Sequence, residues 1–541
     1  MAKVAFENEF TYKKYLESGR EQEFDELFDK AVEGIKKEFG KKYPLLIGDR
    51  EIYASETLEE RSPIDNSTVI GIFQKGTREH AIQAVEAARQ AFVKWSSLNY
   101  KERAALFRNI AKLFQRDKFR LAAVLSYENA KTRYESIGEV DEAIDFLHYY
   151  ANELEANKGY TRKTKLAESA KSVSAGFQGA PSKAEQISIN MKPYGVFGVI
   201  APFNFPISIS TGMCTGALIT GNTIVFKPSS TDNMTMLTGF MVCKLFREAG
   251  VPAGAFNYLT GPGSEVGDEL AASKGIAGIA FTGSKQVGIA LAAKAYAIGA
   301  PKVFVVEMGG KNPTIVAKSA DLECAVSGIA GAAFGFAGQK CSALSRVYVH
   351  ESIKEQFISR LVDKVRSLKI GDPLKKENYM GPLISESAYR RFIETVDKAK
   401  ASGMLLYGGG KVAGIGGFYV EPTIVELRHD NELMHKELFL PILAIDTYRD
   451  FDDALSKSND IEYGLTAGLY TKSAKEVREF SNAIQAGVVY INRPVSATTG
   501  AIVGAHAFVG WKRSGMTGKG TGSRFYLQQF LREQSVSVTR S

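Results

Sequence analysis

The segment PYGVFGVIAPFNFPISISTGMCTGALITGNTIVF, residues 193–226, carries no charged side chain and is longer than a membrane span. Pro202, Asn204, Pro206 and Asn222, together with several glycines, divide it into pieces that are too short for a bilayer helix. We therefore expect a strand, a loop, a helix and a second strand, all packed in a protein core, rather than a membrane segment.

Short strand-like runs alternate with helical runs from this segment onward. VFGVIA (196–201) and NTIVFKP (222–228) flank the helical ISTGMCTGALITG (209–221), and strand-like AFNYLTG (255–261) and GIAGIAFTG (275–283) follow the helical run at 236–250. A helix is expected from about Val287. This alternation predicts a parallel sheet with crossover helices, which is a Rossmann-like architecture.

A second alternating region begins near Lys302 with KVFVVEMGG and predicts a second α/β domain. It continues through YVHES (348–352), a helix over 353–368, and the runs TIVEL (423–427), ILAIDTY (442–448) and GVVYINR (487–493). Before the uncharged segment, residues 20–160 have a helical pattern. Residues 170–193 and the terminal REQSVSVTRS (532–541) contain strand-like runs that could pair, including across subunits.

Composition excludes several classes of protein. The chain has 68 Lys and Arg against 60 Asp and Glu, a balance of +8 that is too dilute for a nucleic-acid-binding protein. The four cysteines form no C-x-x-C pair, which favours a reduced, intracellular (cytoplasmic) protein. The six histidines are scattered, and the closest pair, His429 and His435, does not make a local zinc site, so no metal is expected.

Cys341 is the first candidate for chemistry. It lies in FGFAGQKCSALSRVYV (334–349), after small residues and before an apolar strand. A cysteine in such surroundings is usually inert core, which is the competing interpretation. The Gly338 turn and the adjacent Lys340 instead favour a partly exposed thiol in a positive field, where the thiolate is stabilised.

Glu307 and Asn204 are the second and third candidates. Glu307 ends the strand VFVVE, at the edge where α/β sheets bind ligands, although most glutamates are simply solvated. Asn204 stands between two prolines in PFNFP, where it either satisfies turn backbone or offers a rigid amide to an oxyanion.

A nucleotide site is suggested where FTGS (281–284) follows an apolar strand and opens a helix. Gly283 and the later Gly288 would leave backbone N–H groups and the positive helix end open to phosphates. The motif is not a full G-x-G-x-x-G, so it is weak alone. Lys227, at the end of TIVFK, either binds a ribose or caps a strand with charge.

Together the motifs resemble those of the aldehyde dehydrogenase superfamily, in the family's order. They are PFNFP (202–206), FKPSS (226–230), FTGS (281–284), EMGGKNP (307–313), GQKCS (338–342) and ELFLP (437–441). The resemblance implies Cys341 as nucleophile, Glu307 as general base and Asn204 as oxyanion donor. Around an NAD or NADP cofactor it implies Lys227, Ser230, Gly283, Ser284, Glu437 and Phe439.

The same resemblance implies the architecture. The expected fold is α/β, with a Rossmann-like NAD(P)-binding domain, an α/β catalytic domain and a small β oligomerisation flap. The expected boundaries are a helical extension at 1–45, the NAD(P)-binding domain at 46–169 and 194–306, the catalytic domain at 307–495 and the flap at 170–193 and 520–541. The end of the catalytic domain could return to the cofactor domain. A homo-oligomer, dimeric or larger, is implied.

A narrower resemblance is to the 1-pyrroline-5-carboxylate dehydrogenases of that superfamily. It rests on SPIDNSTVIGIFQKGT (62–77), EVDEAIDFLHYYANEL (139–154), GQKCSALSR (338–346) and TTGAIVGAHAFVGWKRSG (498–515). It implies the oxidation of L-glutamate γ-semialdehyde to L-glutamate, without a metal. The implied anchors of the substrate carboxylate are Ser342, Gly500 and Ala501, and Phe508 would pack on the aliphatic part; successive N–H groups of a Gly-Ala turn suit an anion.

Three departures from the family pattern bear on function. Val509 and Leu440 stand where the family has glycine in P-F-G-G and E-x-F-G-P, which leaves the loop shape near the substrate open. Ser230 replaces a glutamate found in many NAD-preferring relatives, so NADP could also be accepted. The alternatives are a dehydrogenase for another aldehyde, an acylating enzyme that releases product to coenzyme A, and a noncatalytic dinucleotide-binding paralogue.

Overall fold

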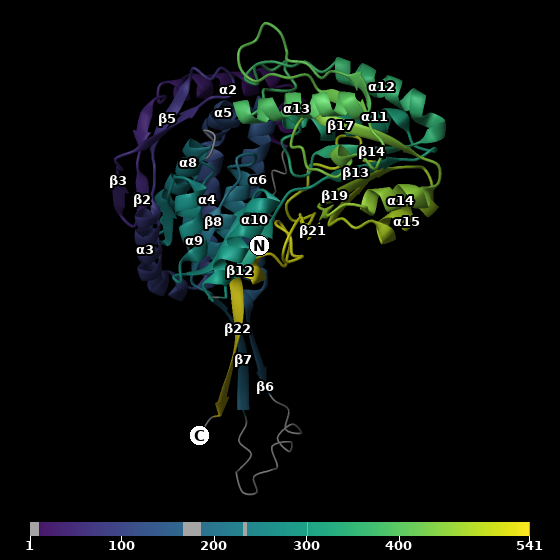
Figure 1. The fold of residues 1–541 in the computed structure, drawn as a ribbon. Helices are drawn as coiled ribbons and strands as arrows, with labels where there is room; N and C mark the ends of the chain where they lie inside the picture. The colour runs from purple at the N-terminus through teal and green to yellow at the C-terminus, as the bar shows by residue number, and fades with distance from the viewer. Residues whose placement is uncertain (1–9, 166–184, 231–234, 300, 540–541) are drawn as a thin grey trace, which may run out of the picture.

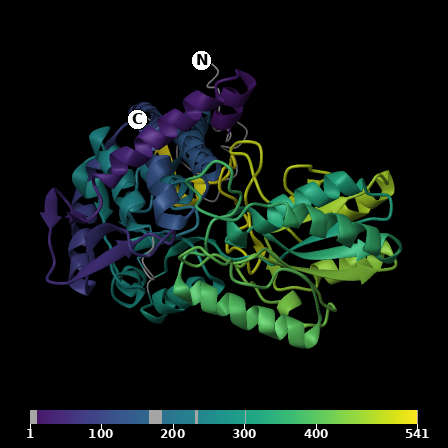
Figure 2. The same ribbon diagram turned by 90° about the horizontal axis from the view of Figure 1, so that it is seen from above.

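The computed structural model describes residues 10–165, 185–230, 235–299 and 301–539 (Figure 1). Two lobes lie side by side, the first made of the N-terminal half and the second of the C-terminal half, and a three-stranded ribbon projects from the first lobe (Figure 1). Viewed from above, the two lobes remain distinct, and yellow C-terminal segments run between them (Figure 2).

The first lobe is built on a seven-stranded sheet in the order β12-β11-β8-β9-β10-β2-β3. Its parallel strands are β8 (Val196–Ile200), β9 (Thr223–Lys227), β10 (Phe256–Tyr258), β11 (Ile276–Thr282) and β12 (Val303–Glu307). The antiparallel edge is β2 (Leu45–Ile47) and β3 (Arg50–Ile52). The intervening helices are α7 (Ser208–Ile219), α8 (Met236–Glu248), α9 (Asp268–Ala272) and α10 (Lys285–Ala297). The predicted Rossmann-like alternation is confirmed.

The uncharged segment 193–226 forms β8, a loop, α7 and β9, as predicted. Every residue of β8 and β9 is buried, and so is α7 except at Ile209. Burial on all sides explains why the segment lacks charges. Among the described residues, no helix is long and apolar enough to cross a membrane.

Two expectations about the order of elements were wrong. The strand of KVFVVE is β12, which pairs with β11 in the first sheet and does not open the second one. The helical pattern expected over 20–160 is interrupted by five strands between Lys41 and Gln74: besides β2 and β3, they are β1 (Lys41–Tyr43), β4 (Thr57–Arg61) and β5 (Val69–Gln74). These strands have three to six residues, too few to show a clear period.

Helices cover the first lobe around these strands. They are α1 (Thr11–Glu17), α2 (Glu21–Lys36), α3 (Arg78–Ser97), α4 (Tyr100–Arg116), α5 (Lys118–Asn129) and α6 (Arg133–Ala156). The N-terminal α1 is attached through Thr11, whose N–H and hydroxyl donate to the buried Asp141 of α6 at 3.0 and 2.7 Å. Asp141 also pairs with Lys118 of α5 at 2.7 Å, so one buried ion pair joins three helices.

The second lobe has its own seven-stranded sheet in the order β15-β16-β17-β14-β13-β19-β20. The strands are β13 (Asn312–Val316), β14 (Leu344–His350), β15 (Met404–Tyr407), β16 (Thr423–Glu426), β17 (Ile442–Tyr448), β19 (Thr466–Tyr470) and β20 (Val488–Ile491). The helices are α11 (Leu322–Phe334), α12 (Lys354–Arg366), α13 (Glu386–Ser402), α14 (Phe451–Asn459) and α15 (Ala474–Ala483). All strands except β15 are parallel to their neighbours, so a second α/β domain is confirmed.

The projecting ribbon consists of β6 (Thr161–Lys165), β7 (Glu185–Pro193) and β22 (Leu531–Thr539). β22 pairs antiparallel with β7 over its whole length, from Leu531 opposite Pro193 to Thr539 opposite Glu185. The expected pairing of these segments therefore occurs within one chain (Figure 1). Residues 170–184 of the predicted flap lie outside the described residues. Just before β22, Tyr526 and Phe530 pack against Gly216 of α7, so the chain returns to the first lobe.

Two buried carboxyl groups meet at the start of α8. Glu60 of β4 accepts from the N–H groups of Met236 and Leu237 at 2.6 and 3.1 Å, and Glu128 of α5 accepts from those of Leu237 and Thr238 at 2.6 and 3.0 Å. Burial raises the pKa of Glu60 well above its ordinary value, with Glu128 contributing, and burial raises that of Glu128 to about 7. At neutral pH the pair therefore retains a proton.

The Glu128→Gln variant is expected to flatten the pH dependence of stability. Because the folded-state pKa is raised, the pair's contribution is fully present below pH 4.5 and is lost as pH rises toward 7, by up to about 1.4 kcal/mol per pH unit for each proton. Glutamine keeps an oxygen for the helix N–H groups but cannot ionise. Thermal midpoints at pH 5 to 8 should fall less steeply for the variant than for wild type. If the thermal midpoints of the variant and the wild type fell equally steeply with pH, the carboxyl pair would not retain a proton at neutral pH.

Candidate active site

Two cavities meet between the lobes, and Cys341 and Thr282 line both of them. The smaller, about 310 Å³, also contains Glu307 and will be called the aldehyde cavity. The larger, about 1180 Å³, extends over the carboxyl ends of β8, β9 and β11 and will be called the dinucleotide cavity. Crevices at this edge of a parallel sheet are where such folds bind ligands.

Cys341 is presented by a tight turn after α11. Phe336 and Ala337 have φ values of +53° and +52°, and Gly338 has +68°. Gly338 must be a glycine, because a Cβ there would overlap the carbonyl oxygen of Leu440. The turn leaves Cys341 partly exposed, as predicted, at the junction of the cavities.

The expected positive field at Cys341 is not observed. Lys340 turns to Glu135, whose Oε1 lies 3.2 Å from its Nζ. Burial, followed by the carboxyl groups of Glu437 and Glu307, raises the pKa of Cys341 to about 12. The free protein therefore holds a thiol. A cation bound beside the sulfur in the dinucleotide cavity would favour the thiolate.

Glu307 lies at the end of β12 and faces the aldehyde cavity together with Cys341. Its Oε2 accepts from the N–H of Gly510 at 3.0 Å, and burial raises its pKa well above the ordinary value. A carboxylate with a raised pKa is a stronger base, so the position and the pKa both suit a group that accepts a proton from water.

Asn204 lies in the loop between β8 and α7 and lines the dinucleotide cavity beside Cys341. Its side chain is buried, with 3% of its surface exposed, and its Nδ2 donates to the carbonyl of Gln339 at 3.2 Å. This bond connects the loop to the cysteine turn and uses one of the two amide hydrogens. The other remains for an oxygen at the sulfur.

All six residues predicted at the cofactor line the dinucleotide cavity: Lys227, Ser230, Gly283, Ser284, Glu437 and Phe439. Lys227 donates to Ser230 Oγ at 3.0 Å, and burial lowers its pKa to about 8. Ser284 is the N-cap of α10, whose first residues, Lys285 to Val287, also line the cavity. A helix N-terminus and a buried lysine provide the donors that a dinucleotide requires, so the residues fit this group.

Leu440 and Val509, which replace family glycines, fit without strain in the backbone. Neither Leu440 nor Val509 has a positive φ; in the ELFLP loop Phe439 takes the left-handed conformation at +59°. Leu440 and Val509 are buried at 5% and 7% exposure. Glycine is required at the next position, Gly510, where a Cβ would overlap the carbonyl group of Ser514. The side chains therefore fill space without forcing the backbone.

The four predicted substrate contacts, Ser342, Gly500, Ala501 and Phe508, all line the aldehyde cavity. Arg493 donates to the carbonyls of Thr499 and Gly500 at 2.9 and 2.7 Å, and Gly500 has a φ of +82°. Within the described chain, the N–H groups of Gly500 and Ala501 have no hydrogen-bond partner. Two successive free N–H groups in a cavity wall can bind an anion.

Several charged residues of this cavity were missed by the sequence analysis. Lys131, Glu135, Glu139 and Glu142 all line it, from α6 and the residues just before it. Lys131 and Glu139 are buried at 1% and 2% exposure. Glu139 and Glu142 lie in the stretch EVDEAIDFLHYYANEL (139–154), but charged side chains on a helix are usually solvated, so nothing in the sequence placed them in a cavity.

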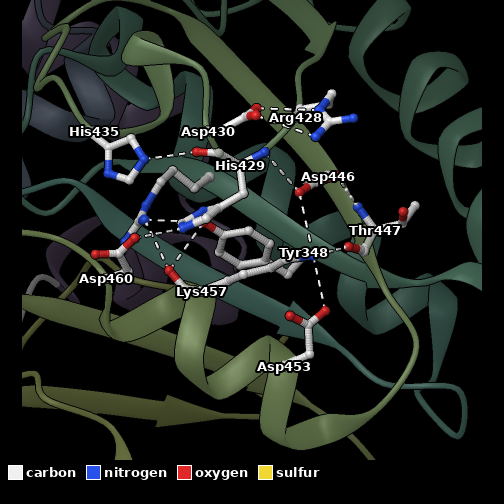
Figure 3. Close-up of polar contacts among 11 residues, drawn as sticks. Tyr348, Arg428, His429, Asp430, His435, Asp446, Thr447, Asp453, Lys457 and Asp460 are labelled. Carbon is white, nitrogen blue, oxygen red and sulfur yellow. Dashed lines mark hydrogen bonds and ion pairs between the residues drawn. The ribbon is translucent and has the colours of Figure 1, made fainter.

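His429 and His435 have a third neighbour that the sequence did not indicate. Asp460, at the end of α14, lies 3.0 Å from His429 Nε2, and the ligand atoms of the three residues lie within 4.8 Å of one another (Figure 3). The spacing of the histidines excluded only a local zinc site, and Asp460 comes from a distant segment; the expectation that no metal is bound stays a prediction. Tyr348 occupies the other ring nitrogen of His429 at 2.9 Å, and His435 Nε2 lies 2.8 Å from the carbonyl oxygen of His429. Protein atoms thus already hold both rings.

The parallel sheet, the cysteine between two cavities and the neighbouring glutamate define an aldehyde-oxidising dehydrogenase. A sequence model described as the Aldehyde dehydrogenase family matches residues 52–536, and the chain belongs to this family.

Its relatives place it more narrowly. A protein of Halalkalibacterium halodurans named 1-pyrroline-5-carboxylate dehydrogenase 1 is 35% identical over 517 residues, covering 94% of this chain and 95% of that protein. The crystal structure of 1-pyrroline-5-carboxylate dehydrogenase from Thermus with bound NAD has 33% identity and a TM-score of 0.87, over 95% of this chain and 96% of that one. Proline utilization A from Bdellovibrio bacteriovorus matches with a TM-score of 0.87 and 35% identity, and this chain spans 52% of its length.

Proposed function

We propose that this protein oxidises L-glutamate γ-semialdehyde to L-glutamate with NAD or NADP, a reaction of proline catabolism. The observation that carries the proposal is the position of Cys341, between the dinucleotide cavity and an aldehyde cavity whose wall contains two free N–H groups. The names of the relatives support the same substrate.

The chemistry follows from the placement of three side chains. Cys341 first releases its thiol proton to solvent, and the thiolate sulfur attacks the aldehyde carbon; the carbonyl π pair moves to the oxygen, and the resulting alkoxide accepts hydrogen bonds from Asn204 Nδ2 and the Cys341 N–H. A dinucleotide held by the residues of the larger cavity, among them Lys227, Ser284 and Glu437, would supply the acceptor for the hydride that leaves this carbon, and the carbon would then remain on the sulfur as a thioester. Glu307 takes a proton from water, the water oxygen attacks the thioester carbon, and the sulfur leaves with the free acid as product.

The aldehyde cavity supports a substrate that carries a carboxylate. Gly500 and Ala501 present their N–H groups, Ser342 can add a hydroxyl, and Phe508 contributes an aromatic wall. Hydrogen bonds to a charged group are each stronger than those to a neutral one. An aldehyde with a carboxylate at the far end can therefore occupy the N–H groups and reach Cys341 at once.

The carboxylate anchor predicts a specificity that assays can measure. We expect kcat/KM for the semialdehyde to exceed that for a neutral aliphatic aldehyde of similar length by about 10- to 100-fold, because charged hydrogen bonds are lost with the neutral compound. Ser342→Ala should lower kcat/KM for the semialdehyde about 10-fold and leave the neutral aldehyde unaffected. Succinic semialdehyde also has a carboxylate, so its kcat/KM tests how the reaction depends on the length of the aldehyde. A higher kcat/KM for the neutral aldehyde than for the semialdehyde would contradict the proposed binding of the substrate carboxylate.

The same observations support an assignment of domains and of oligomeric state. We infer that residues 46–169 and 194–306 bind the cofactor, that 307–495 form the catalytic domain, and that 1–45 are an N-terminal extension, whose described part is helical over α1 and α2 and then includes β1. Among the described residues, β22 and β6 are the two edge strands of the ribbon, which suits pairing with a second copy. Ser230, next to Lys227, offers no carboxylate that would repel the 2′-phosphate of NADP.

A further inference from the structure

A buried ion pair lies behind the loop that carries Asn204. Lys131, just before α6, and Glu139, on α6, are in contact through Nζ and Oε2. Both line the aldehyde cavity, yet almost none of either side chain is exposed. Burying two charges costs more free energy than an isolated pair usually returns, so further contacts must account for it.

Lys131 contacts the beginning of the loop. Its Nζ donates to the main-chain carbonyl of Asn204 at 2.6 Å and lies 3.6 Å from the ring centroid of Phe205. It also lies 4.9 Å from the ring of Phe336, in the turn that presents Cys341. One ammonium group therefore touches the backbone of the oxyanion donor and packs against the turn of the nucleophile.

Glu139 contacts the other end of the same loop. Its Oε1 accepts from the N–H groups of Ile207 and Ser208 at 2.7 and 3.1 Å. These groups stand at the start of α7, where the helix leaves its first N–H groups without partners. The carboxylate thus holds the start of α7, while its other oxygen holds Lys131.

We propose that Lys131 and Glu139 act as a positioning pair that fixes residues 204–208, so that the Asn204 amide faces the oxygen that develops at Cys341. The prolines at 202 and 206 restrict the loop's own dihedral angles, but they do not set its distance from the cysteine turn. The ion pair holds both ends of the loop, and Lys131 also packs against Phe336 of the cysteine turn, so it supports the bond from Asn204 to Gln339. The inference rests on the proposed role of Asn204.

A double-mutant cycle tests this pair. Lys131→Met keeps the length of the side chain and removes the ammonium, and we expect kcat/KM for the semialdehyde to fall about 100-fold, as for loss of one oxyanion donor. Asn204→Ala should cost at least as much. The combined variant should be no slower than Asn204→Ala alone, because both changes remove the same interaction. Multiplicative losses would overturn the proposal.

A matched control separates positioning from stability. Lys118→Met breaks a second buried Lys–carboxylate pair, between Lys118 of α5 and Asp141 of α6, whose third partner is Thr11 of α1. We expect it to lower the thermal midpoint as Lys131→Met does, but to keep kcat/KM within about twofold. If kcat/KM fell by similar factors in both variants, Lys131 would contribute to the stability of the fold and not to the position of Asn204. NAD binding should be unchanged in the Lys131→Met and Lys118→Met variants, because neither lysine lines the dinucleotide cavity.

Two further measurements keep the test decisive. Glu139→Gln tests the same pair if Lys131→Met does not fold. Glutamine retains an acceptor for the N–H groups of Ile207 and Ser208 but has no charge, so we expect kcat/KM to fall less, by about 10-fold. Crystal structures of the Lys131 and Lys118 variants should show the Asn204 amide displaced only in the first. An unmoved Asn204 would overturn the positioning role, whether or not the semialdehyde is the substrate. Absence of wild-type activity with the semialdehyde would instead defeat the proposed function.

Discussion

Cys341→Ala is expected to abolish NADH formation from the semialdehyde, by about 10⁴-fold or more in kcat/KM. Alanine removes the sulfur that bonds to the aldehyde carbon, and no other described cysteine lines either cavity. Absorbance of NADH measures the reaction. Dinucleotide binding, followed by fluorescence, should persist, because Lys227, Ser284, Glu437 and the other residues that line the larger cavity beside Cys341 are unchanged.

Cys324→Ala is the matched control for this variant. Cys324 is also partly exposed, but its sulfur contacts the carbonyl of Asn492 in the second lobe. The same chemical change there should leave kcat/KM within about twofold. If the Cys341 variant kept more than about one hundredth of wild-type activity, Cys341 would not be the nucleophile.

Glu307→Gln is expected to stop the reaction after the first hydride transfer. The amide keeps an oxygen for the N–H of Gly510 but cannot accept a proton from water. Rapid mixing should show about one NADH per active site, followed by turnover that is slower by about 10²- to 10⁴-fold. If the variant lost both the initial formation of NADH and the later turnover, Glu307 would accept the proton of the thiol and not that of the water that attacks the thioester.

The pH dependence and the product check the same assignment. Because the pKa of Glu307 is raised, wild-type turnover should rise as pH increases through that pKa and the carboxylate forms, and the variant should lack this rise. The free acid should be the product. Preferential formation of acyl-coenzyme A would instead support the acylating alternative.

Local sequence patterns predicted much of the fold. The uncharged run at 193–226 became β8, α7 and β9, because a segment buried on both faces needs no polar side. The pattern did not assign β12 to a sheet, since a buried parallel strand looks the same in either lobe. The strands between Lys41 and Gln74 were missed because each spans at most six residues.

The residues of the candidate site also fall into two groups: those that the sequence indicates and those that only the structure reveals. The motifs that carry Cys341, Glu307 and Asn204 are contiguous in sequence, so their residue types could be recognised before any coordinates were available. Lys131 lies outside all the family motifs, and Glu139 opens the stretch EVDEAIDFLHYYANEL (139–154) without any indication there of this contact; both reach the PFNFP loop from more than 60 residues away. Their role depends on a contact through space that no spacing along the chain reveals.

The amino-acid sequence alone determined the alternation of elements, the turns that need glycine and the identities of the reactive side chains, because each depends on neighbours within a few positions. The tertiary structure decided which sheet β12 joins, where Lys340 points, and why the thiol of Cys341 is protonated in the free protein. These properties depend on charges and burial supplied by distant segments, since electrostatic energies follow distance in space and the local dielectric environment.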